Sequence, residues 1–364
     1  MRPVLPILRT ISLTLFCLYL LSLLLFWTDA AVDGARRGLT LVLETLLPSL
    51  FPFLVFSELL VTSGAGNALG RIAGAPIKRL FGLSDRGALC VLLGSVCGFP
   101  VASATAVSYK KTGAMSAREL QRITLFANNP SSGFLIAAVG TGMLGSKRAG
   151  VALFVITLAA AALCGVALRA LLGRADATEE QEVPPQPKPL GVETFTGSVR
   201  RALFTFLQVA ALVIFFSSVA GASAALLATL KPPVILTVLL HGTLELTGGA
   251  SSATTALPPR VAFLCVAFLA SFSGLSVCLQ IHTLTEGEGT RIGAYLLAKL
   301  AQGLIALTLA DAYLLLARPT LTPTESVAAF APTHAFPTLL ALALLSLFCL
   351  LLTKKKRHAI QRTL

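Results

Sequence analysis

Residues 125–134 are LFANNPSSGF, a polar interruption within a run that is otherwise apolar enough to cross a membrane. Five polar or helix-breaking residues occur in succession: Asn128, Asn129, Pro130, Ser131 and Ser132. A broken helix frees backbone groups that hydrocarbon cannot satisfy, so such a break is stable only where it lines a cavity or packs on protein. The segment therefore predicts a membrane helix interrupted to hold a polar solute. The alternative is that these side chains only bond neighbouring helices, as is common in membrane bundles.

The composition indicates a polytopic membrane protein. Of the 364 residues, 55% are hydrophobic and only 12% are charged, whereas about a quarter of the residues in a soluble domain are charged. The net charge is +13, an excess that in membrane proteins mostly reflects the basic loops that set topology. Because no basic stretch is interleaved with aromatic residues, nucleic acid is not expected as a partner.

Enzymatic and metal-binding motifs are missing from the sequence. The seven cysteines lie in or next to apolar runs and form no CxxC pair, so neither a disulfide framework nor a metal site is expected. HExxH, GxSxG and Walker motifs do not occur. The segment GTGMLG, residues 140–145, fits GxGxxG but joins two predicted spans and follows no strand. We therefore expect no enzyme and no cofactor.

Apolar runs of helical length follow one another along the chain. They fall at about residues 8–27, 39–62, 87–109, 123–144, 149–172, 199–222, 232–257, 261–284, 291–317 and 334–353. None alternates as a strand would, so all are predicted to be helices. The first run might suggest a signal peptide, but it is longer than the apolar core of one and lacks a good cleavage site, so a retained span is predicted.

The run 87–109 is predicted to enter the membrane and return. Basic clusters flank it on both sides: Arg71, Lys78, Arg79 and Arg86 before it, and Lys110, Lys111, Arg118 and Arg122 after it. A single crossing would place one cluster outside, against the tendency of Lys and Arg to stay in the cytoplasm. Its middle, GSVCGFPVASA at 94–104, is rich in Gly and Ser with one Pro, which suits the tip of a re-entrant hairpin.

The chain divides into two halves with a similar order of parts. The polar, acidic and Pro-rich segment 173–198 predicts a cytoplasmic linker. LLGSVCGFPVAS at 92–103 corresponds to LLHGTLELTGGAS at 239–251, and FANNPSSGFL at 126–135 to FLASFSGLSV at 268–277. If both termini lie in the cytoplasm, the second half crosses the membrane in the opposite orientation to the first. The predicted fold is an all-α integral membrane protein with about eight transmembrane helices plus two re-entrant hairpins in two inverted-topology repeats, as in many secondary transporters.

The predicted organisation has five parts. They are an N-terminal transmembrane helix and connector (1–38), a first repeat (39–172), the linker (173–198), a second repeat (199–317), and a C-terminal transmembrane helix with a basic tail (318–364). Solutes of such transporters bind near the membrane midplane, where discontinuous helices meet. The interruptions are therefore where we look for a site.

Candidate solute-binding residues follow from the interruptions. In the first half they are Asn128, Asn129, Ser131 and Ser132; in the second they are Glu245, Thr247, Ser273, Ser276 and Gln280. A carboxylate at a helix centre costs about 2.5–3.5 kcal/mol on insertion scales, so Glu245 should face the interior. There it would couple transport to a proton or cation, bind the solute, or only cap the hairpin. The last three residues share one helical face, and packing of small residues is their alternative role.

Several other polar residues lie within apolar runs without an evident partner. They are Glu44, Glu58, Lys299 and Asp311, any of which could pair inside the protein. His241 is expected to be a satisfied interior residue rather than a switch. None of these is assigned to the predicted solute site.

Five segments together resemble the YlbJ family, the sporulation stage V integral membrane proteins. They are LLPSLFPFLVFSELLVTSG (46–64), GSVCGFPVAS (94–103), ANNPSSGFLIAAVG (127–140), GTLELTGG (242–249) and FSGLSVCLQ (272–280). They occur in the family's order. The resemblance implies a gate or nucleoside-recognition domain related to concentrative nucleoside transporters. It also implies residence in the outer forespore membrane and movement of dipicolinic acid from the mother cell towards the forespore.

The family pattern adds candidates at the first hairpin and in the second half. The resemblance implies a solute near Gly98, Phe99, Pro100 and Ser103, near residues 128–132, and near Glu245 to Gly248 and Ser273 to Gln280. This chain departs from the pattern at Ala102, Ser132 and Cys278, where Gly, Pro and His are usual. Dipicolinate is a planar dianion, so helix N-termini and Asn and Ser donors would suit its carboxylates.

Two other functions stay open from the sequence. A nucleoside or other small polar solute would want an aromatic platform, and only Phe99 and Phe134 lie near the motifs. A structural membrane protein that recruits other sporulation proteins is the alternative of another class. The lipid bilayer is a partner under each of these functions.

Overall fold

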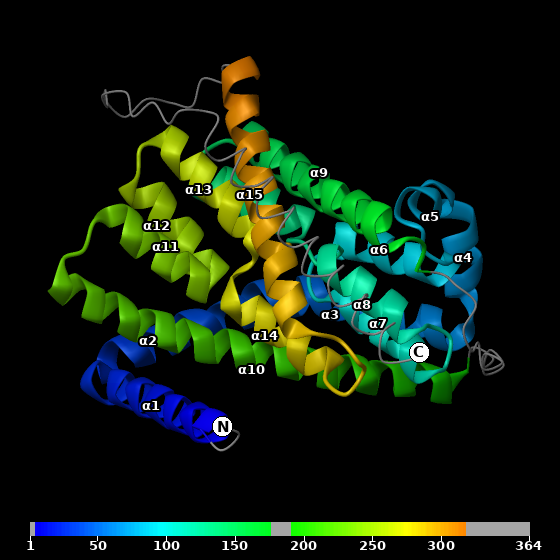
Figure 1. Cartoon of the computed structure of the whole chain (residues 1–364), viewed down its shortest axis with the longest axis horizontal. Helices are drawn as coiled ribbons and strands as arrows, with labels where there is room; N and C mark the ends of the chain where they lie inside the picture. The colour runs from blue at the N-terminus through cyan, green and yellow to red at the C-terminus, as the bar shows by residue number, and fades with distance from the viewer. Residues whose placement is uncertain (1–3, 176–190, 318–364) are drawn as a thin grey trace.

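The computed structural model describes residues 4–175 and 191–317, and every regular element in these two ranges is a helix (Figure 1). Most of the predicted linker, the predicted last span at 334–353 and the basic tail lie outside the described residues. The all-helical prediction is confirmed for the described part of the chain.

The described elements fall on either side of the linker. The first half contains α1 (Val4–Phe26), α2 (Thr28–Thr40), the π-helix η1 (Leu41–Leu46), α3 (Leu47–Ser63), α4 (Ala65–Ala73), α5 (Ala75–Phe81), α6 (Asp85–Cys97), α7 (Val101–Lys111), α8 (Ala117–Phe126), the π-helix η2 (Phe134–Met143) and α9 (Lys147–Leu172). The second half contains α10 (Val192–Leu230), α11 (Val234–Leu244), α12 (Leu246–Ala256), α13 (Pro259–Phe272), α14 (Gly274–Thr285) and α15 (Ile292–Ala317). Because α10 begins at Val192, the last residues of the predicted linker are helical.

Five helical stretches are long and apolar enough to cross a membrane. They are Thr28–Ser63, Lys147–Leu172, Val192–Leu230, Pro259–Thr285 and Ile292–Ala317, and all five coincide with predicted spans. Of the other three predicted spans, 8–27 forms the shorter apolar helix Thr10–Phe26, 123–144 is broken, and 334–353 lies outside the described residues. A sixth candidate is the pair α5 and α6, which is bent by 101° just before the predicted hairpin.

Four interruptions divide the predicted helices, each where small or polar residues replace apolar ones. Break 1 (residues 98–100) separates α6 from α7, and break 2 (residues 127–131) separates α8 from the helical turn that leads into η2. Break 3 is Glu245, between α11 and α12, and break 4 is Ser273, between α13 and α14. The predicted interruption of each of these runs is confirmed.

The breaks are of two kinds. Across break 1, α6 and α7 pack against each other, and across break 3, α11 and α12 do the same, so each pair forms a helical hairpin. Break 4 instead lets α14 continue the course of α13 across the molecule (Figure 1). Breaks 1 and 3 are thus hairpin tips, and break 4 interrupts a longer helical path.

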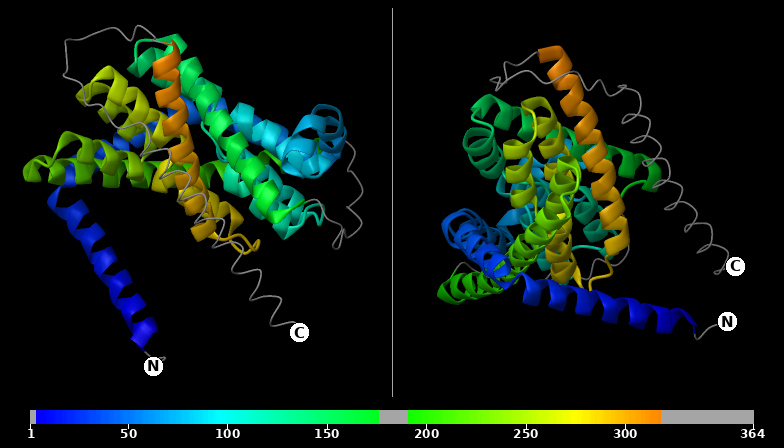
Figure 2. Two further views of the ribbon diagram at one scale, coloured as in Figure 1. Left: turned by 45° about the horizontal axis from the view of Figure 1, so that its top comes forward. Right: turned by 90° about the vertical axis from the view of Figure 1, so that its left-hand side faces the viewer.

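Two helices of the second half bind it to the first. The 39-residue α10 packs along α2 and α3 and also contacts α1, while α15 packs on α8 and α9 as well as on α13 (Figure 1). By contrast, α1 extends away from the helical body in both views of Figure 2. Its exposed side chains include Leu13, Leu15 and Phe16, which suits contact with lipid.

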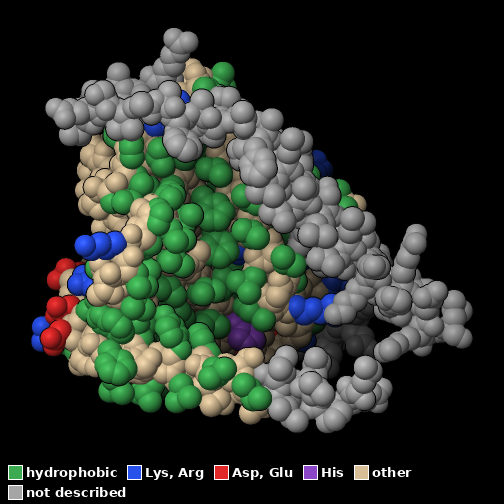
Figure 3. All heavy atoms as spheres, turned by 60° about the vertical axis from the view of Figure 1, so that its left-hand side comes forward, with side chains coloured by type: hydrophobic (Ala, Val, Ile, Leu, Met, Phe, Trp, Pro, Cys, Tyr) green, Lys and Arg blue, Asp and Glu red, His purple; other side chains and the backbone are tan. Residues whose placement is uncertain are grey.

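The surface of the body is also mainly apolar. Figure 3 shows a face covered largely by hydrophobic side chains, with charged side chains mostly towards its margins. A soluble protein rarely exposes so continuous an apolar surface. This distribution fits a protein whose sides are surrounded by lipid, and the chain is an integral membrane protein.

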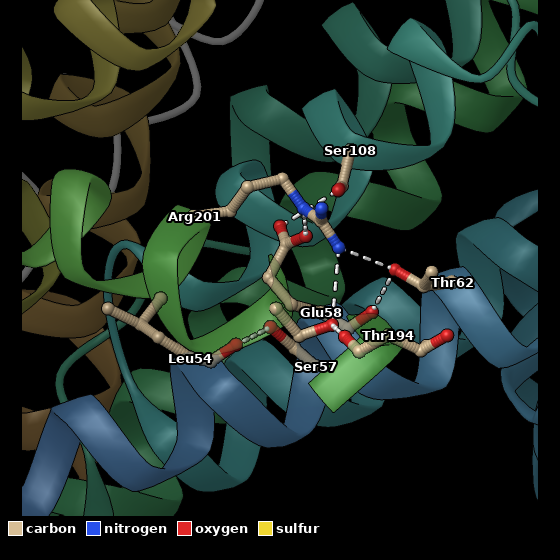
Figure 4. A network of polar contacts seen from close by, with 8 residues as sticks. Leu54, Ser57, Glu58, Thr62, Ser108, Thr194 and Arg201 are labelled. Carbon is tan, nitrogen blue, oxygen red and sulfur yellow. Dashed lines mark hydrogen bonds and ion pairs between the residues drawn. The ribbon is translucent and has the colours of Figure 1, made fainter. Parts of the chain in front are cut away.

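A polar network fixes α10 against the first half (Figure 4). The Arg201 Nε of α10 lies 2.7 Å from Glu58 Oε2 of α3, and Ser108 Oγ of α7 donates to Glu58 Oε1 at 2.8 Å. The Arg201 guanidinium also donates to Thr62 Oγ1 at 2.8 Å. Helices α3, α7 and α10, which come from both halves, therefore meet at the Glu58 carboxylate. Arg201 is the partner of Glu58 that the sequence did not identify.

Removing the guanidinium from this network should cost stability. The Glu58 side chain is 11% exposed and that of Arg201 48%, so Arg201→Gln should lower the free energy of unfolding by about 1–2 kcal/mol, less than for a fully buried pair. Adding Glu58→Gln should recover part of the loss because an amide needs no counter-charge. Thermal unfolding in detergent checks both, with exposed Arg200→Gln as the control. Equal stability of Arg201→Gln and the native chain would contradict the role of the pair.

The α11–α12 hairpin depends on backbone contact between two glycines. A Cβ placed on Gly249 would lie 2.1 Å from the Cα of Gly242, far inside contact distance. We expect Gly249→Ala to destabilise the protein by about 1–3 kcal/mol through overpacking. The neighbouring Gly248→Ala is the matched control, since its Cβ would meet only Glu245 Oε2 at 3.4 Å. Equal melting temperatures for the two variants would show that the hairpin is not packed this closely.

Candidate functional site

A cavity of about 450 Å³ is lined by residues of breaks 1, 2 and 3 and by α14, the helix that follows break 4. Gly98 and Phe99 of break 1, Pro130 and Ser131 of break 2, and Glu245 of break 3 line it; α14, which begins after break 4, contributes Ser276, Val277 and Gln280. The volume falls within the range of about 300–1,000 Å³ that small-molecule sites occupy. The structure therefore brings together interruptions that are far apart in the sequence and come from both halves.

The candidates from the sequence divide into two groups. Those that line the cavity are Gly98, Phe99, Ser131, Glu245, Thr247, Ser276 and Gln280. Those that do not line it are Pro100, Ser103, Asn128, Asn129, Ser132, Gly248 and Ser273. Solute binding by either group stays a prediction, but only the first group faces the space that a solute could occupy.

One wall of the cavity was missing from the prediction. It is formed by η1 and the start of α3, which contribute the polar residues Glu44, Thr45 and Ser49. The only sequence signal was the carboxylate of Glu44 inside an apolar run. Since this run carries no break, nothing in its pattern placed it beside the interruptions.

Breaks 1 and 2 touch through a glycine. Gly98 has a φ of +88°, a conformation that L side chains rarely adopt, and a Cβ there would lie 2.7 Å from the backbone N of Ser131. The backbones of the two breaks thus form one continuous part of the cavity wall. A glycine at this position is required both by its conformation and by the contact.

The two asparagines of break 2 point into protein rather than into the cavity. Asn128 Nδ2 donates to Ser103 Oγ at 2.8 Å and to the carbonyl of Thr124 at 3.1 Å. Asn129 Nδ2 donates to the carbonyl of Phe126 at 3.1 Å. Both side chains are buried, at 0% and 1% exposure. They satisfy the end of α8 and the hairpin helix α7, which matches the alternative role considered for them.

Glu245 caps the helix that follows break 3. Its Oε1 accepts from the backbone N–H of Thr247 at 2.8 Å, and its Oε2 accepts from that of Gly248 at 2.7 Å. An acidic group at a helix N-terminus is stabilised by the free N–H groups and by the helix dipole. The same residue lines the cavity, so capping and solute contact are compatible roles.

The cavity carries carboxylates but no cationic side chain. Glu44 and Glu245 are its charged residues, and no Lys, Arg or His occurs among the described residues that line it. Its other polar groups include Ser131, Ser276 and Gln280. Gln280 Nε2 donates to Ser276 Oγ at 3.2 Å, so these two side chains form a short polar strip on α14. The site offers hydrogen bonds of both kinds and a net negative side-chain charge.

The other polar residues within apolar runs find partners away from the cavity. Asp311 accepts from Arg260 at 3.0 Å, and His241 Nδ1 lies 3.2 Å from Ser252 Oγ. Lys299 donates to the backbone carbonyl of Asn128 in break 2. Ser273 is buried, and its hydroxyl lies 3.4 Å from the carbonyl of Ala270 in its own helical path.

The fold and the cavity define a polytopic helical membrane protein with a solute-sized chamber between its two halves. The chain is distantly homologous to the sporulation integral membrane protein YlbJ of Bacillus subtilis (strain 168), with 24% identity over 338 residues that cover 82% of this chain and 81% of the relative. No family model and no solved structure matches the chain.

The cap at break 3 can be tested by substitution. Glu245→Ala leaves the N–H groups of Thr247 and Gly248 without their acceptor, so the free energy of unfolding should fall by about 1 kcal/mol. Glu245→Gln keeps one acceptor and should lose less. Glu44→Gln is the control, because Glu44 lines the same cavity without capping a helix. Thermal unfolding in detergent is the measurement, and equal losses in the Glu245→Ala and Glu44→Gln variants would count against the cap.

Proposed function

We propose that this chain is a membrane transporter that binds a small polar or anionic solute in the cavity lined by breaks 1, 2 and 3 and by α14. The relative's name places that protein in sporulation, and the family resemblance makes dipicolinic acid the first candidate, moved from the mother cell across the outer forespore membrane. The observation that carries the proposal is the meeting of four interrupted helical paths around one cavity. Broken membrane helices are tolerated where they line such a space.

Transport also requires that the cavity open alternately to each side. In the proposed arrangement, α6–α7 and α11–α12 are re-entrant hairpins that belong to two inverted repeats, and rocking of one repeat against the other changes access. Both hairpins contribute to the lining of the cavity, through Gly98 and Glu245. A small relative movement of the halves would therefore alter the cavity itself.

Dipicolinate imposes a condition on the two carboxylates. A dianion beside Glu44 and Glu245 is repelled unless protons or cations accompany it, because the described lining has no positive side chain. We therefore propose that uptake is coupled to protons, with Glu245 as the first candidate carrier. Backbone N–H groups at the breaks and the hydroxyls of Ser131 and Ser276 would hold the solute.

The charge of the cavity also favours a second candidate, a neutral nucleoside-like solute. Carboxylates and amides bind the hydroxyl and amino groups of such a molecule without a counter-charge. Phe99 and Phe134 line the cavity and would contact its ring. The two candidates differ in whether a pH gradient is needed for uptake.

A native cysteine allows the site to be tested in the unaltered protein. Cys97 lines the cavity, and free glutathione in the same solution reports the reactivity of the reagent. Labelling by a water-soluble maleimide, followed by mass spectrometry of each peptide, should be slowed at Cys97 about tenfold by a solute at ten times its dissociation constant. Glutathione should react at an unchanged rate. Dipicolinate and nucleosides are the probes.

Uptake of labelled solute into proteoliposomes distinguishes the functions. Dipicolinate transport predicts accumulation that rises with an inward proton gradient and a weaker pH dependence in Glu245→Gln. Nucleoside transport predicts uptake without that gradient. If neither solute protects Cys97 or enters the vesicles, while the full chain still supports sporulation, transport of these solutes is excluded and an assembly role replaces it.

A further inference from the structure

A fully buried lysine in α15 reaches across the molecule to break 2. Lys299 Nζ donates to the backbone carbonyl of Asn128 at 2.9 Å and to Gln302 Oε1 at 3.1 Å. Gln302 in turn donates through Nε2 to Asn129 Oδ1 at 2.5 Å. Both side chains of α15 are 0% exposed. Being three residues apart, they share one face of α15.

The contact matches the need of an interrupted helix. Beyond Phe126 the chain leaves the helical path, so the carbonyl of Asn128 requires a donor from elsewhere. The side-chain amide of Asn128 cannot supply that donor, because it donates to Ser103 and Thr124. Within residues 4–175 and 191–317, the lysine forms no ion pair with a carboxylate. Its partners are the side-chain oxygen of Gln302 and the carbonyl of Asn128, which lies just beyond the C-terminal end of α8, where a helix dipole favours a positive group.

What the contact supports is the cavity wall. Asn128 and Asn129 are followed at once by Pro130 and Ser131, which line the cavity, and Ser131 touches Gly98 of break 1. In Figure 1, α15 crosses the body on the side of α8 and α9. The hydrogen bonds that reach break 2 from α15 therefore come from the second half of the chain. A shift of α15 would displace breaks 2 and 1 together.

We propose that Lys299 and Gln302 are positioning residues that hold break 2 in the geometry of the cavity wall and transmit movement of α15 to it. The inference rests on the proposed function in that the cavity is taken as the solute site. Neither residue lines the cavity, so they act through the backbone of residues 128–131 and not by touching the solute.

The labelling rate of Cys97, which lines the cavity, measures how accessible the cavity wall is, and the measurement does not require transport. Lys299→Met removes the donor to the Asn128 carbonyl and the bond that holds Gln302, and Gln302→Leu removes the bond to Asn129. We expect each to raise the rate of maleimide labelling at Cys97 at least about fivefold, because an unsatisfied buried carbonyl destabilises the closed wall. Lys299→Gln retains an amide donor and should restore part of the native rate. Free glutathione serves as the standard for reagent reactivity.

A matched control lies one to two turns further along α15. Thr308 Oγ1 donates to the carbonyl of Ile305 in its own helix at 2.8 Å, so Thr308→Val removes a bond that reaches no other element. This variant should leave Cys97 labelling and uptake unchanged. If Lys299→Met does not fold, the Gln302→Leu and Lys299→Gln variants carry the comparison.

The outcomes separate this inference from the proposed function. Unchanged Cys97 labelling in folded Gln302→Leu and Lys299→Gln, or an equal rise in Thr308→Val, would overturn the positioning role even if dipicolinate still protects Cys97. A selective rise with no protection by any solute tested would support the positioning role and count against the proposed function. A rise in the KM for uptake that follows the labelling rates would support both.

Discussion

Backbone groups released where a membrane helix is broken must find partners inside the protein, because hydrocarbon offers none. The four breaks of this chain meet that constraint in different ways. Break 3 places the Glu245 carboxylate on the N–H groups of the next helix. Break 2 uses amides of its own together with a lysine from the other half. Break 3 is thus satisfied from within its own segment, whereas break 2 also needs a partner from the other half of the chain.

These solutions decide which groups remain for a solute. The amides of Asn128 and Asn129 are consumed within the protein, so the cavity beside them is lined by Pro130 and Ser131 instead. Glu245 serves the helix and the cavity at once. The remaining hydroxyls, Gln280 and two carboxylates make the chamber polar. Because the carboxylates carry negative charge, an anionic solute would need protons or cations to accompany it.

Contacts between the halves are concentrated at a few polar points within extensive apolar packing. Glu58 and Arg201 join α3, α7 and α10, and Lys299 joins α15 to break 2. Glu58 and Lys299 are ionisable groups held where solvent access is low, so their contacts are costly to disturb. If the halves move during transport, these are the contacts through which the movement reaches the cavity.

The sequence alone determined the class of protein and the positions of the interruptions, because Pro130, the glycines and the polar clusters act on the local backbone whatever surrounds them. It did not determine which polar side chains face the cavity. Asn128 was predicted to bind solute but faces Ser103, while Glu44, in an unbroken run, lies in the wall. The direction of a side chain depends on which helix packs over it. For break 2 that helix is α15, which contributes Lys299 and Gln302. Only the tertiary packing of distant segments could supply that partner.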